Sequence, residues 1–371
     1  MIAFKRYTVM ALACFALLSS CSSDSDGNNP KADYDRQAMV ANYAENLIIP
    51  AYSVFLEKTD AMNAAIAAFA ATPTTATLAA ARTSYQNAYL AWQDVGTYEF
   101  GPADDQLLRT NLNTYPTDAA EIERNIAATS YNLQAAANLD AKGFPALDYL
   151  LYGAGTEAAV VNQYTSGANA GKRKQYLQDV SSLVKQRVEA VQSGWTTGDY
   201  ATTFKNSPGT AVGSAIGSLV NELNYEIDLT KRAKVGIPSG RFTSGTALPE
   251  QVEAYYSRIS LELLKQAIRA QKAIFMGQTA TGTNGPGLDD YLDHVQAPYE
   301  NGLLSDAIEA QFDAALAAAN AIQVPLAEAV STQPQAVTKV YDELQRLIVL
   351  TKTDMPAALG VTITYNDNDG D

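Results

Sequence analysis

The sequence predicts an all-α protein, built as two antiparallel helical-bundle domains packed side by side. Apolar residues recur at three- and four-residue spacing along almost the whole chain, which is the period of a helix that buries one face. No run of alternating apolar and polar residues with hairpin chemistry interrupts this pattern. Helices of this kind usually bury their apolar stripes against one another in antiparallel bundles.

The expected helices follow from this spacing in chain order. Amphipathic stretches run over residues 36–57, 60–71, 76–98, 118–139, 173–193 and 303–323. Three further helices are marked by apolar residues from Val212 to Ile227, from Val252 to Leu263, and from Val337 to Met355. The last of these alternates by four and three, as the seam of a bundle does.

Three glycines are expected at the start of the Val212 helix. Gly209, Gly213 and Gly217 recur every four residues, and small residues at this spacing let helices approach closely. In a chain without membrane-spanning segments this indicates tight packing inside the fold, with an interface to a partner as the alternative.

Breaker residues divide the chain into domains. The segment 235–246 (VGIPSGRFTSGT) is the longest passage rich in Gly, Pro and Ser between helices, and such passages mark boundaries. We therefore expect one helical-bundle domain over residues 35–235 and a second over 236–358. The acidic residues 359–371 are expected to form a tail, whose last six residues stop short of the glutamate that a calcium loop requires.

The N-terminus has the features of an export signal. Lys5 and Arg6 precede a short apolar segment that ends in Leu18-Ser-Ser-Cys21, and this segment is too short to span a bilayer. The sequence predicts a lipoprotein signal peptide over residues 1–20, lipidation of Cys21 and a flexible tether over residues 21–34. An ordinary signal peptide or a true anchor is the alternative. The expected location is the outer membrane, at the cell surface or on its periplasmic face.

The charge balance limits the class of partner. The chain carries a net charge of −14, and removal of the predicted signal takes away the positive charges of Lys5 and Arg6. Such a surface repels phosphate backbones, so the chain is not expected to bind nucleic acid. We expect contact with the membrane through the N-terminal lipid, and a small ligand, a metal or a protein as the further partner.

Several kinds of catalytic site are excluded by what the chain lacks. His294 is the single histidine, so a histidine-rich metal site is impossible. His294 and Asp290 are spaced to share a helix face and bind one cation together, but a solvated acidic turn is the favoured interpretation. No cysteine nucleophile remains once Cys14 leaves with the signal and Cys21 is lipidated.

Two passages rich in aromatic residues each carry a carboxylate. Residues 92–102 (WQDVGTYEFGP) place Glu99 after a helix, and residues 143–153 (GFPALDYLLYG) place Asp148 one turn after Pro145. Proline is well tolerated in the first turn of a helix, so a helix is expected to begin near Gly143. A carboxylate among Tyr, Leu and Phe is either a paired structural group or a ligand of something cationic.

With these passages and the segment 234–242 (KVGIPSGRF), which contains Arg241, the chain resembles the imelysin-like proteins, or peptidase M75 family. The resemblance covers roughly residues 35–356 and implies a two-domain helical lipoprotein or periplasmic protein with a site between the bundles. It also implies an association with iron uptake. The family signature Gly-x-His-x-x-Glu is thought to supply metal ligands. Here it is degenerate, with Pro145 in place of the histidine and Asp148 in place of the glutamate.

This departure favours a binding protein over an enzyme. Proline cannot ligate a metal, and one carboxylate is too little for tight zinc or iron binding. We expect non-catalytic ligand binding in the inter-domain cleft, by Asp148, Pro145, Glu99 and Arg241. No catalytic residue or metal ligand is assigned, and iron or calcium is the metal to consider. Asp148 with Glu99, Asp104, Asp105 and Asp118 would suit calcium if these carboxylates meet. The alternatives are a metallopeptidase-type hydrolase with an altered site and a surface scaffold subunit.

Overall fold

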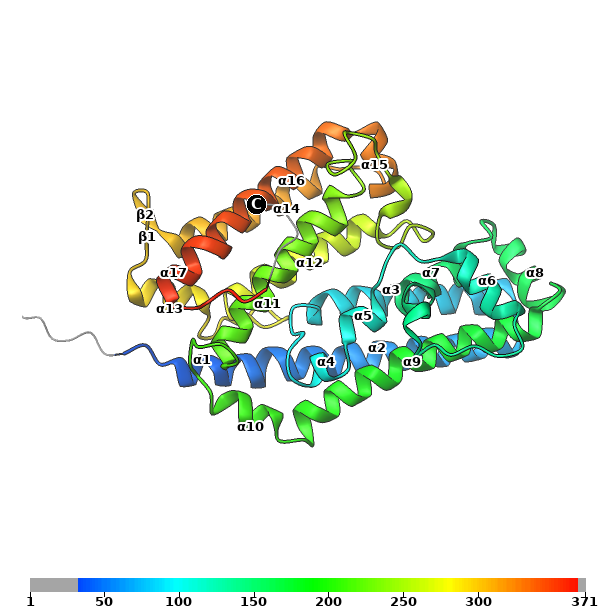
Figure 1. Cartoon of the computed structure of the whole chain (residues 1–371), viewed down its shortest axis with the longest axis horizontal. Coiled ribbons are helices and arrows are strands. Elements are labelled where there is room, and N and C mark those ends of the chain that lie inside the picture. Colours follow the sequence, from blue (N-terminus) through cyan, green and yellow to red (C-terminus); the bar gives the residue numbers. More distant parts are fainter. Residues whose placement is uncertain (1–32, 366–371) are drawn as a thin grey trace, which may run out of the picture. The chain divides into compact units, whose positions relative to one another are not determined.

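The computed structural model describes residues 33–365, and the first half of this range is helical as expected (Figure 1). Its elements are α1 (Arg36–Asn42), η1 (Tyr43–Ile48), α2 (Ile49–Ala71), α3 (Thr75–Val95), α4 (Pro102–Asp105), α5 (Leu108–Leu112), α6 (Ala119–Ala127), η2 (Ala136–Ala141), α7 (Gly143–Tyr152), α8 (Glu157–Thr165), α9 (Ala170–Thr196) and α10 (Tyr200–Lys205). The predicted signal peptide, Cys21 and most of the tether lie outside the described residues.

The second half continues in the same way, with one very short hairpin. Its elements are α11 (Ala215–Leu229), η3 (Thr230–Gly236), η4 (Pro249–Gln251), α12 (Ser260–Phe275), α13 (Leu288–Val295), β1 (Pro298–Tyr299), β2 (Gly302–Leu303), α14 (Leu304–Asn320), α15 (Leu326–Thr332), α16 (Pro334–Val349), η5 (Leu350–Asp354) and α17 (Met355–Leu359). The all-α prediction is confirmed. The hairpin pairs Pro298 with Leu303 and Tyr299 with Gly302, and sequence periodicity did not indicate it.

Three long helices build the core of the first half. α2 packs against both α3 and α9 (Figure 1), and α7 closes the group against α9. Aromatic side chains fill the space between them. The rings of Tyr89 and Phe144 stack with centroids 4.6 Å apart, and Phe55 packs on both Trp92 and Phe144. Large buried rings of this kind contribute strongly to core stability.

The second half is built around α12, α14 and α16. α14 lies along both of the others, and α11 packs against α12 and α16. α11 therefore lies with the second group of helices although it precedes residue 235. The described residues from Asp35 onward form one compact unit by their contacts, and the division into domains at residue 235 stays a prediction.

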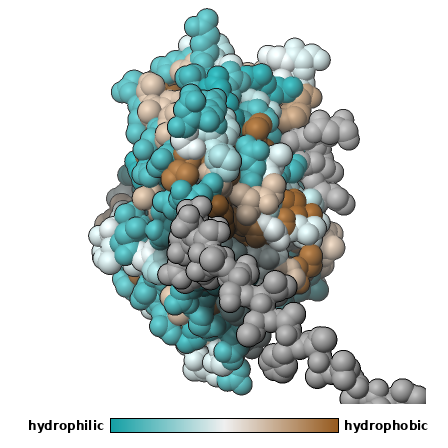
Figure 2. All heavy atoms as spheres, turned by 90° about the vertical axis from the view of Figure 1, so that its left-hand side faces the viewer, coloured by the Kyte–Doolittle hydropathy of each residue, from teal (hydrophilic) through white to brown (hydrophobic). Residues whose placement is uncertain are grey.

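The two groups of helices meet where α3 packs against α12. A polar bridge runs across this contact, because Gln266 in α12 donates a 2.6 Å hydrogen bond to Asp94 in α3. The Tyr43 hydroxyl of η1 also donates to the carbonyl of Ile274, at the end of α12, at 2.6 Å. On one face, hydrophilic residues predominate with apolar residues scattered among them (Figure 2). Among residues 33–365, no helix is both long and apolar enough to cross a bilayer.

The structure corrects the helix predicted from Val252 to Leu263. α12 begins only at Ser260, and residues 252–259 form an irregular loop in which Ala254 and Arg258 have positive φ angles of 53° and 65°. Val252 is buried, but Tyr255 is exposed and Tyr256 and Ile259 are only partly buried, so the apolar spacing here does not mark one buried helix face. We call residues 252–258 the 252–258 loop.

The glycine stripe is also placed differently. α11 begins at Ala215, so Gly209 and Gly213 precede the helix, and Val212 is exposed. Gly213 has a φ of 80°, which suits glycine. A Cβ on Gly217 would lie 2.4 Å from the carbonyl oxygen of Ala211. Gly217 therefore closely approaches the loop that precedes its own helix, and not a neighbouring helix.

The helix predicted over residues 118–139 is shorter than expected. α6 ends at Ala127, and η2 starts only at Ala136. The predicted acidic tail also begins with ordered contacts, because the Asn221 side chain donates to the carbonyl of Thr362 and accepts from the amide of Thr364. Residues 366–371 lie outside the described residues.

Candidate functional site

α7 carries both altered positions of the family signature. Gly143 at its start has a φ of 71°, and a Cβ there would lie 2.3 Å from the carbonyl oxygen of Leu112, so only glycine fits this close crossing of the backbone. Pro145 follows in the first turn, as predicted. Asp148 lies one turn further on, and both Pro145 and Asp148 are buried.

Asp148 holds the 252–258 loop. Its Oδ2 accepts the backbone N–H of Tyr256 at 2.7 Å, and its Oδ1 accepts the N–H of Ser257 at 3.1 Å. The Tyr85 hydroxyl of α3 donates to Oδ1 at 3.0 Å. Burial raises the pKa of Asp148 to about 6, and these donors oppose the rise. The carboxylate therefore connects three segments that lie far apart in the sequence.

This arrangement does not fit a metal ion at the family signature. Pro145 offers no ligand atom, and the Asp148 oxygens already accept three hydrogen bonds from neutral donors. Within residues 33–365, no group of three or more His, Cys, Asp or Glu side chains is arranged to hold a metal ion. Asp118, one of the candidate calcium ligands, instead caps α6 by accepting the N–H of Glu121.

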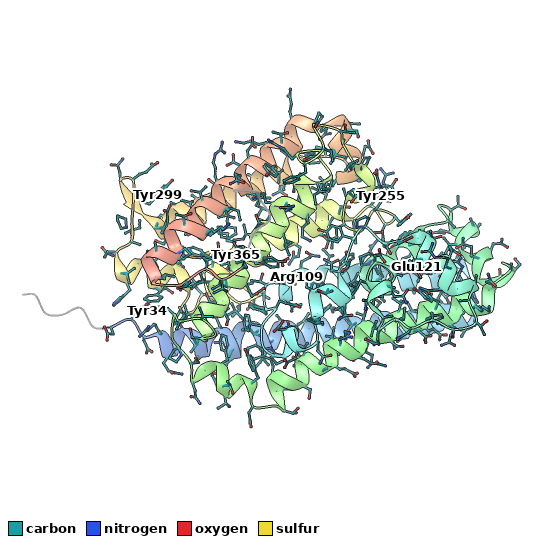
Figure 3. The ribbon with its side chains drawn as sticks, in the orientation of Figure 1. Tyr34, Arg109, Glu121, Tyr255, Tyr299 and Tyr365 are labelled. Carbon is teal, nitrogen blue, oxygen red and sulfur yellow. The ribbon has the colours of Figure 1, made fainter. Side chains whose placement is uncertain are left out.

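A pocket of about 260 Å³ lies beside these two residues. Pro145 and Asp148 line it from α7, Tyr115 from the segment after α5, and Gln251, Tyr255 and Tyr256 from η4 and the 252–258 loop. Tyr255, which is labelled in Figure 3, is 40% exposed. We call this the Pro145 pocket. It presents aromatic rings and phenol hydroxyls, which suit an organic ligand.

The other two predicted binding residues lie elsewhere. Glu99 accepts the backbone N–H of Arg109 with both oxygens, at 2.9 and 3.0 Å. Arg241 pairs with Asp342 at 2.8 Å and lies over the ring of Tyr341. Neither Glu99 nor Arg241 lines the Pro145 pocket, so the structure brings together only Asp148 and Pro145 of the four.

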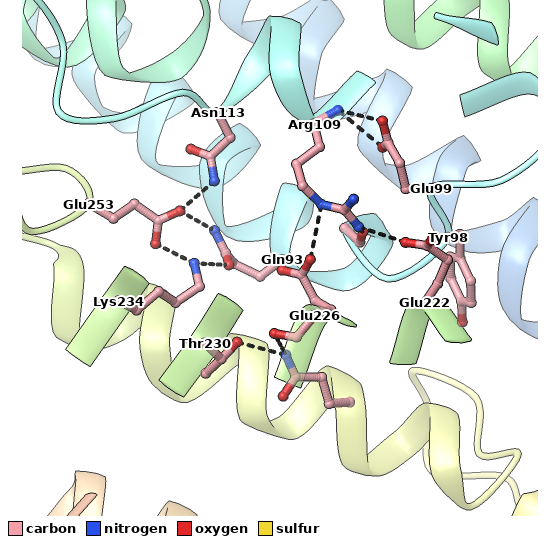
Figure 4. Close-up of polar contacts among 12 residues, drawn as sticks. Gln93, Tyr98, Glu99, Arg109, Asn113, Glu222, Glu226, Thr230, Lys234 and Glu253 are labelled. Atoms are coloured by element: carbon pink, nitrogen blue, oxygen red, sulfur yellow. Dashed lines mark hydrogen bonds and ion pairs between the residues drawn. The ribbon is translucent and has the colours of Figure 1, made fainter. Parts of the chain in front are cut away.

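Glu99 belongs to a cluster around a single cation. The Arg109 guanidinium donates to Glu226 at 3.2 Å, to Glu222 at 3.1 Å and to the carbonyl of Gly96 at 2.9 Å (Figure 4). Burial raises the pKa of Glu99 to about 7; the nearby Arg109 lowers it, and Glu222 and Glu226 raise it. We call these four charged side chains the Arg109 cluster. It ties α5 to α11.

A second buried cluster was not predicted from the sequence. Lys234 in η3 pairs with Glu253 at 2.5 Å and donates to the side chain of Gln93 at 2.9 Å. The other Glu253 oxygen accepts from Asn113 at 2.8 Å and from Gln93 at 3.3 Å (Figure 4). Glu253 lies between the pocket-lining residues Val252 and Ala254, and Asn113 lies two residues from Tyr115. The cluster therefore holds two walls of the Pro145 pocket.

No spacing in the sequence indicates this second cluster, since its residues come from four separate segments. In the Asp290–His294 pair, Asp290 has a structural role. Its carboxylate accepts the backbone N–H of Gly287 and so caps α13. The favoured interpretation of this pair, a solvated acidic turn, stays a prediction.

Replacing Asp148 with Asn tests its role as the anchor of the loop. The amide would turn a donor toward an N–H or a hydroxyl that needs an acceptor, and an unsatisfied buried group costs about 1 to 3 kcal/mol. We expect urea unfolding to show a loss of this size, with faster hydrogen exchange at the amides of Tyr256 and Ser257. Asp105→Asn, at an exposed position, is the matched control. An unchanged exchange rate at both amides would contradict the anchoring role.

Comparisons with known proteins agree with this fold. The sequence profile of the family described as Imelysin matches residues 48–353. Iron-regulated protein A from Synechococcus elongatus is 23% identical over 367 residues, covering 93% of each chain. Two crystal structures share the fold. An iron-regulated protein A precursor from Parabacteroides distasonis has a TM-score of 0.72 at 20% identity, covering 87% of this chain and 95% of its own. An imelysin-like protein from Psychrobacter arcticum has a TM-score of 0.66 at 18% identity, covering 89% and 97%.

The matched profile spans most of the described residues and includes both the α7 segment and the 252–258 loop. The chain belongs to the imelysin family.

Proposed function

We propose that the chain is an exported, lipid-anchored binding protein of the imelysin family that holds an organic ligand in the Pro145 pocket. It carries out no catalysis, and its iron-related role is the binding of iron as an organic chelate rather than as a bare ion. Cys21 supplies the lipid anchor at the outer membrane. The name of the relative from Synechococcus elongatus supports the link to iron.

One observation carries this proposal. The two altered positions of the family signature line a pocket, while the only carboxylate among them already accepts three hydrogen bonds from protein donors. A bare cation would have to break these bonds and would find only one further carboxylate in the pocket lining, that of Glu250, whereas hard cations usually take several oxygen ligands. An organic ligand needs only the surface that the pocket already presents.

Calorimetric titration of the purified protein tests the proposal. We expect no saturable binding of Fe²⁺, Zn²⁺ or Ca²⁺, and saturable binding of at least one ferric chelate among citrate, a trihydroxamate and a catecholate. Gln251→Trp, which fills the pocket from η4, should abolish chelate binding. Val349→Trp, at an exposed position on α16, should leave it unchanged.

Two results would overturn the proposal. One is tight binding of a bare ion that Asp148→Asn removes, and the other is the absence of binding by every ferric chelate. Casein digestion with and without a chelator tests the hydrolase alternative, and we expect no cleavage in either case.

A further inference from the structure

A second pocket adjoins the Pro145 pocket across two tyrosines. It has a volume of about 420 Å³, and Tyr152 of α7, Arg258 of the 252–258 loop and Glu328 of α15 line it. Tyr255 and Tyr256 line both pockets. We call this second space the Glu328 pocket. A ligand that reaches across Tyr255 and Tyr256 would contact both.

The wall between the pockets is fixed before any ligand arrives. The Tyr256 N–H is held by Asp148, and the Tyr256 ring makes edge contacts with Tyr149 at 5.3 Å and Tyr255 at 5.2 Å between centroids. On the far side, Arg258 of the same loop pairs with Glu328 at 2.9 Å. A wall ordered in this way loses little conformational entropy when a ligand binds.

The charges along the two pockets select among ligands. Among residues 33–365, no Lys, Arg or His lines the Pro145 pocket, which contains the carboxylates of Asp148 and Glu250. The Glu328 pocket has one cation, Arg258, and that cation is already paired. Buried anionic ligands need unpaired cations or free N–H donors. A strongly anionic ligand is therefore disfavoured at both pockets.

From these features, and resting on the proposed function, we infer that the ligand is a ferric trihydroxamate chelate that spans both pockets across Tyr255 and Tyr256. Three hydroxamate groups neutralise Fe³⁺, so the complex carries no negative charge into the carboxylate-lined space. Its hydrocarbon linkers match the tyrosine and proline rings, and its amide and hydroxamate oxygens match the phenol hydroxyls and the Gln251 amide. The ferric catecholates carry three negative charges, which the pockets do not compensate.

The test compares chelates of different charge on the same protein. Ferrichrome, a neutral ferric trihydroxamate, and ferric enterobactin, a trianionic catecholate, are titrated separately into the wild-type protein. We expect ferrichrome to bind at least tenfold more tightly. This comparison of affinities uses the wild-type protein alone, so it does not depend on whether any variant folds. Stronger binding of the catecholate would overturn the inference and leave the proposed function standing, whereas binding of neither these chelates nor ferric citrate would overturn both.

Variants then test the span across the tyrosines. Gln251→Trp fills the Pro145 pocket, and Ala327→Trp fills the Glu328 pocket, which Ala327 lines. Each variant should bind ferrichrome at least tenfold more weakly than the wild type, whereas Val349→Trp should bind it equally well. A loss with Gln251→Trp alone would contradict the span. Glu328→Gln frees Arg258 from its partner, so the catecholate should bind this variant better than it binds the wild type. Thermal melting of each variant shows that it is folded.

Discussion

Replacing Glu253 with Leu is expected to lower the free energy of unfolding by about 3 to 5 kcal/mol, because breaking a buried ion pair leaves the remaining charge uncompensated. The side chains of Glu253 and Lys234 are 1% and 4% exposed. The variant would also remove the acceptor that Asn113 and Gln93 share. Urea unfolding at neutral pH measures the loss.

The matched control removes both charges. In the double variant Lys234→Met with Glu253→Leu no buried charge is left alone, so at least half of the lost stability should return. Because Glu253 lies within the 252–258 loop, between the pocket-lining residues Val252 and Ala254, the single variant should also weaken the binding of any ligand in the Pro145 pocket. A loss below about 1 kcal/mol for Glu253→Leu would show that water reaches Lys234 and that the ion pair does not hold the walls of the Pro145 pocket.

The fold class was predictable because helical periodicity is a local property. The stripes around residues 173–193, 303–323 and 337–355 correspond to α9, α14 and the run from α16 to α17. The failure at Val252 is equally instructive. Val252 belongs to an irregular loop whose backbone N–H groups donate to Asp148, and sequence spacing does not indicate a contact between residues so far apart in the chain.

The candidate site was predictable only where its residues belong to one short sequence motif. Pro145 and Asp148 lie one turn apart in the same helix, so the family signature was enough to locate them. The structure places both at a pocket. Glu99 and Arg241 come from passages that also resemble the family, but the structure pairs them with Arg109 and Asp342. Gln251, Tyr255 and Glu253 acquire their positions only through tertiary contacts, and residue type alone did not distinguish them.

The Arg109 cluster predicts how stability changes with pH. Burial raises the pKa of Glu99 to about 7 in the folded protein, above the 4.5 of an ordinary glutamate, so over this range the folded state holds a proton that the unfolded state releases. The free energy of unfolding should therefore fall as the pH rises from about 4.5 to 7. Glu99→Gln keeps one oxygen for the Arg109 N–H and removes the titration. This variant should show a flatter profile and should be more stable than the wild type at pH near 8 by about 1 to 3 kcal/mol.

Arg109→Met should have the opposite and larger effect. It leaves Glu99, Glu222 and Glu226 close together without their shared cation, and removing one partner of a buried ion pair costs about 3 to 5 kcal/mol. The cost should be greatest near pH 8 and smaller near pH 5, where protonation of Glu99 relieves the repulsion. Urea unfolding of the wild type and both variants at the two pH values measures this. An equal cost at both would mean that Arg109 acts through its packing on Tyr225 and its bond to Gly96, and that the carboxylates are already screened by solvent.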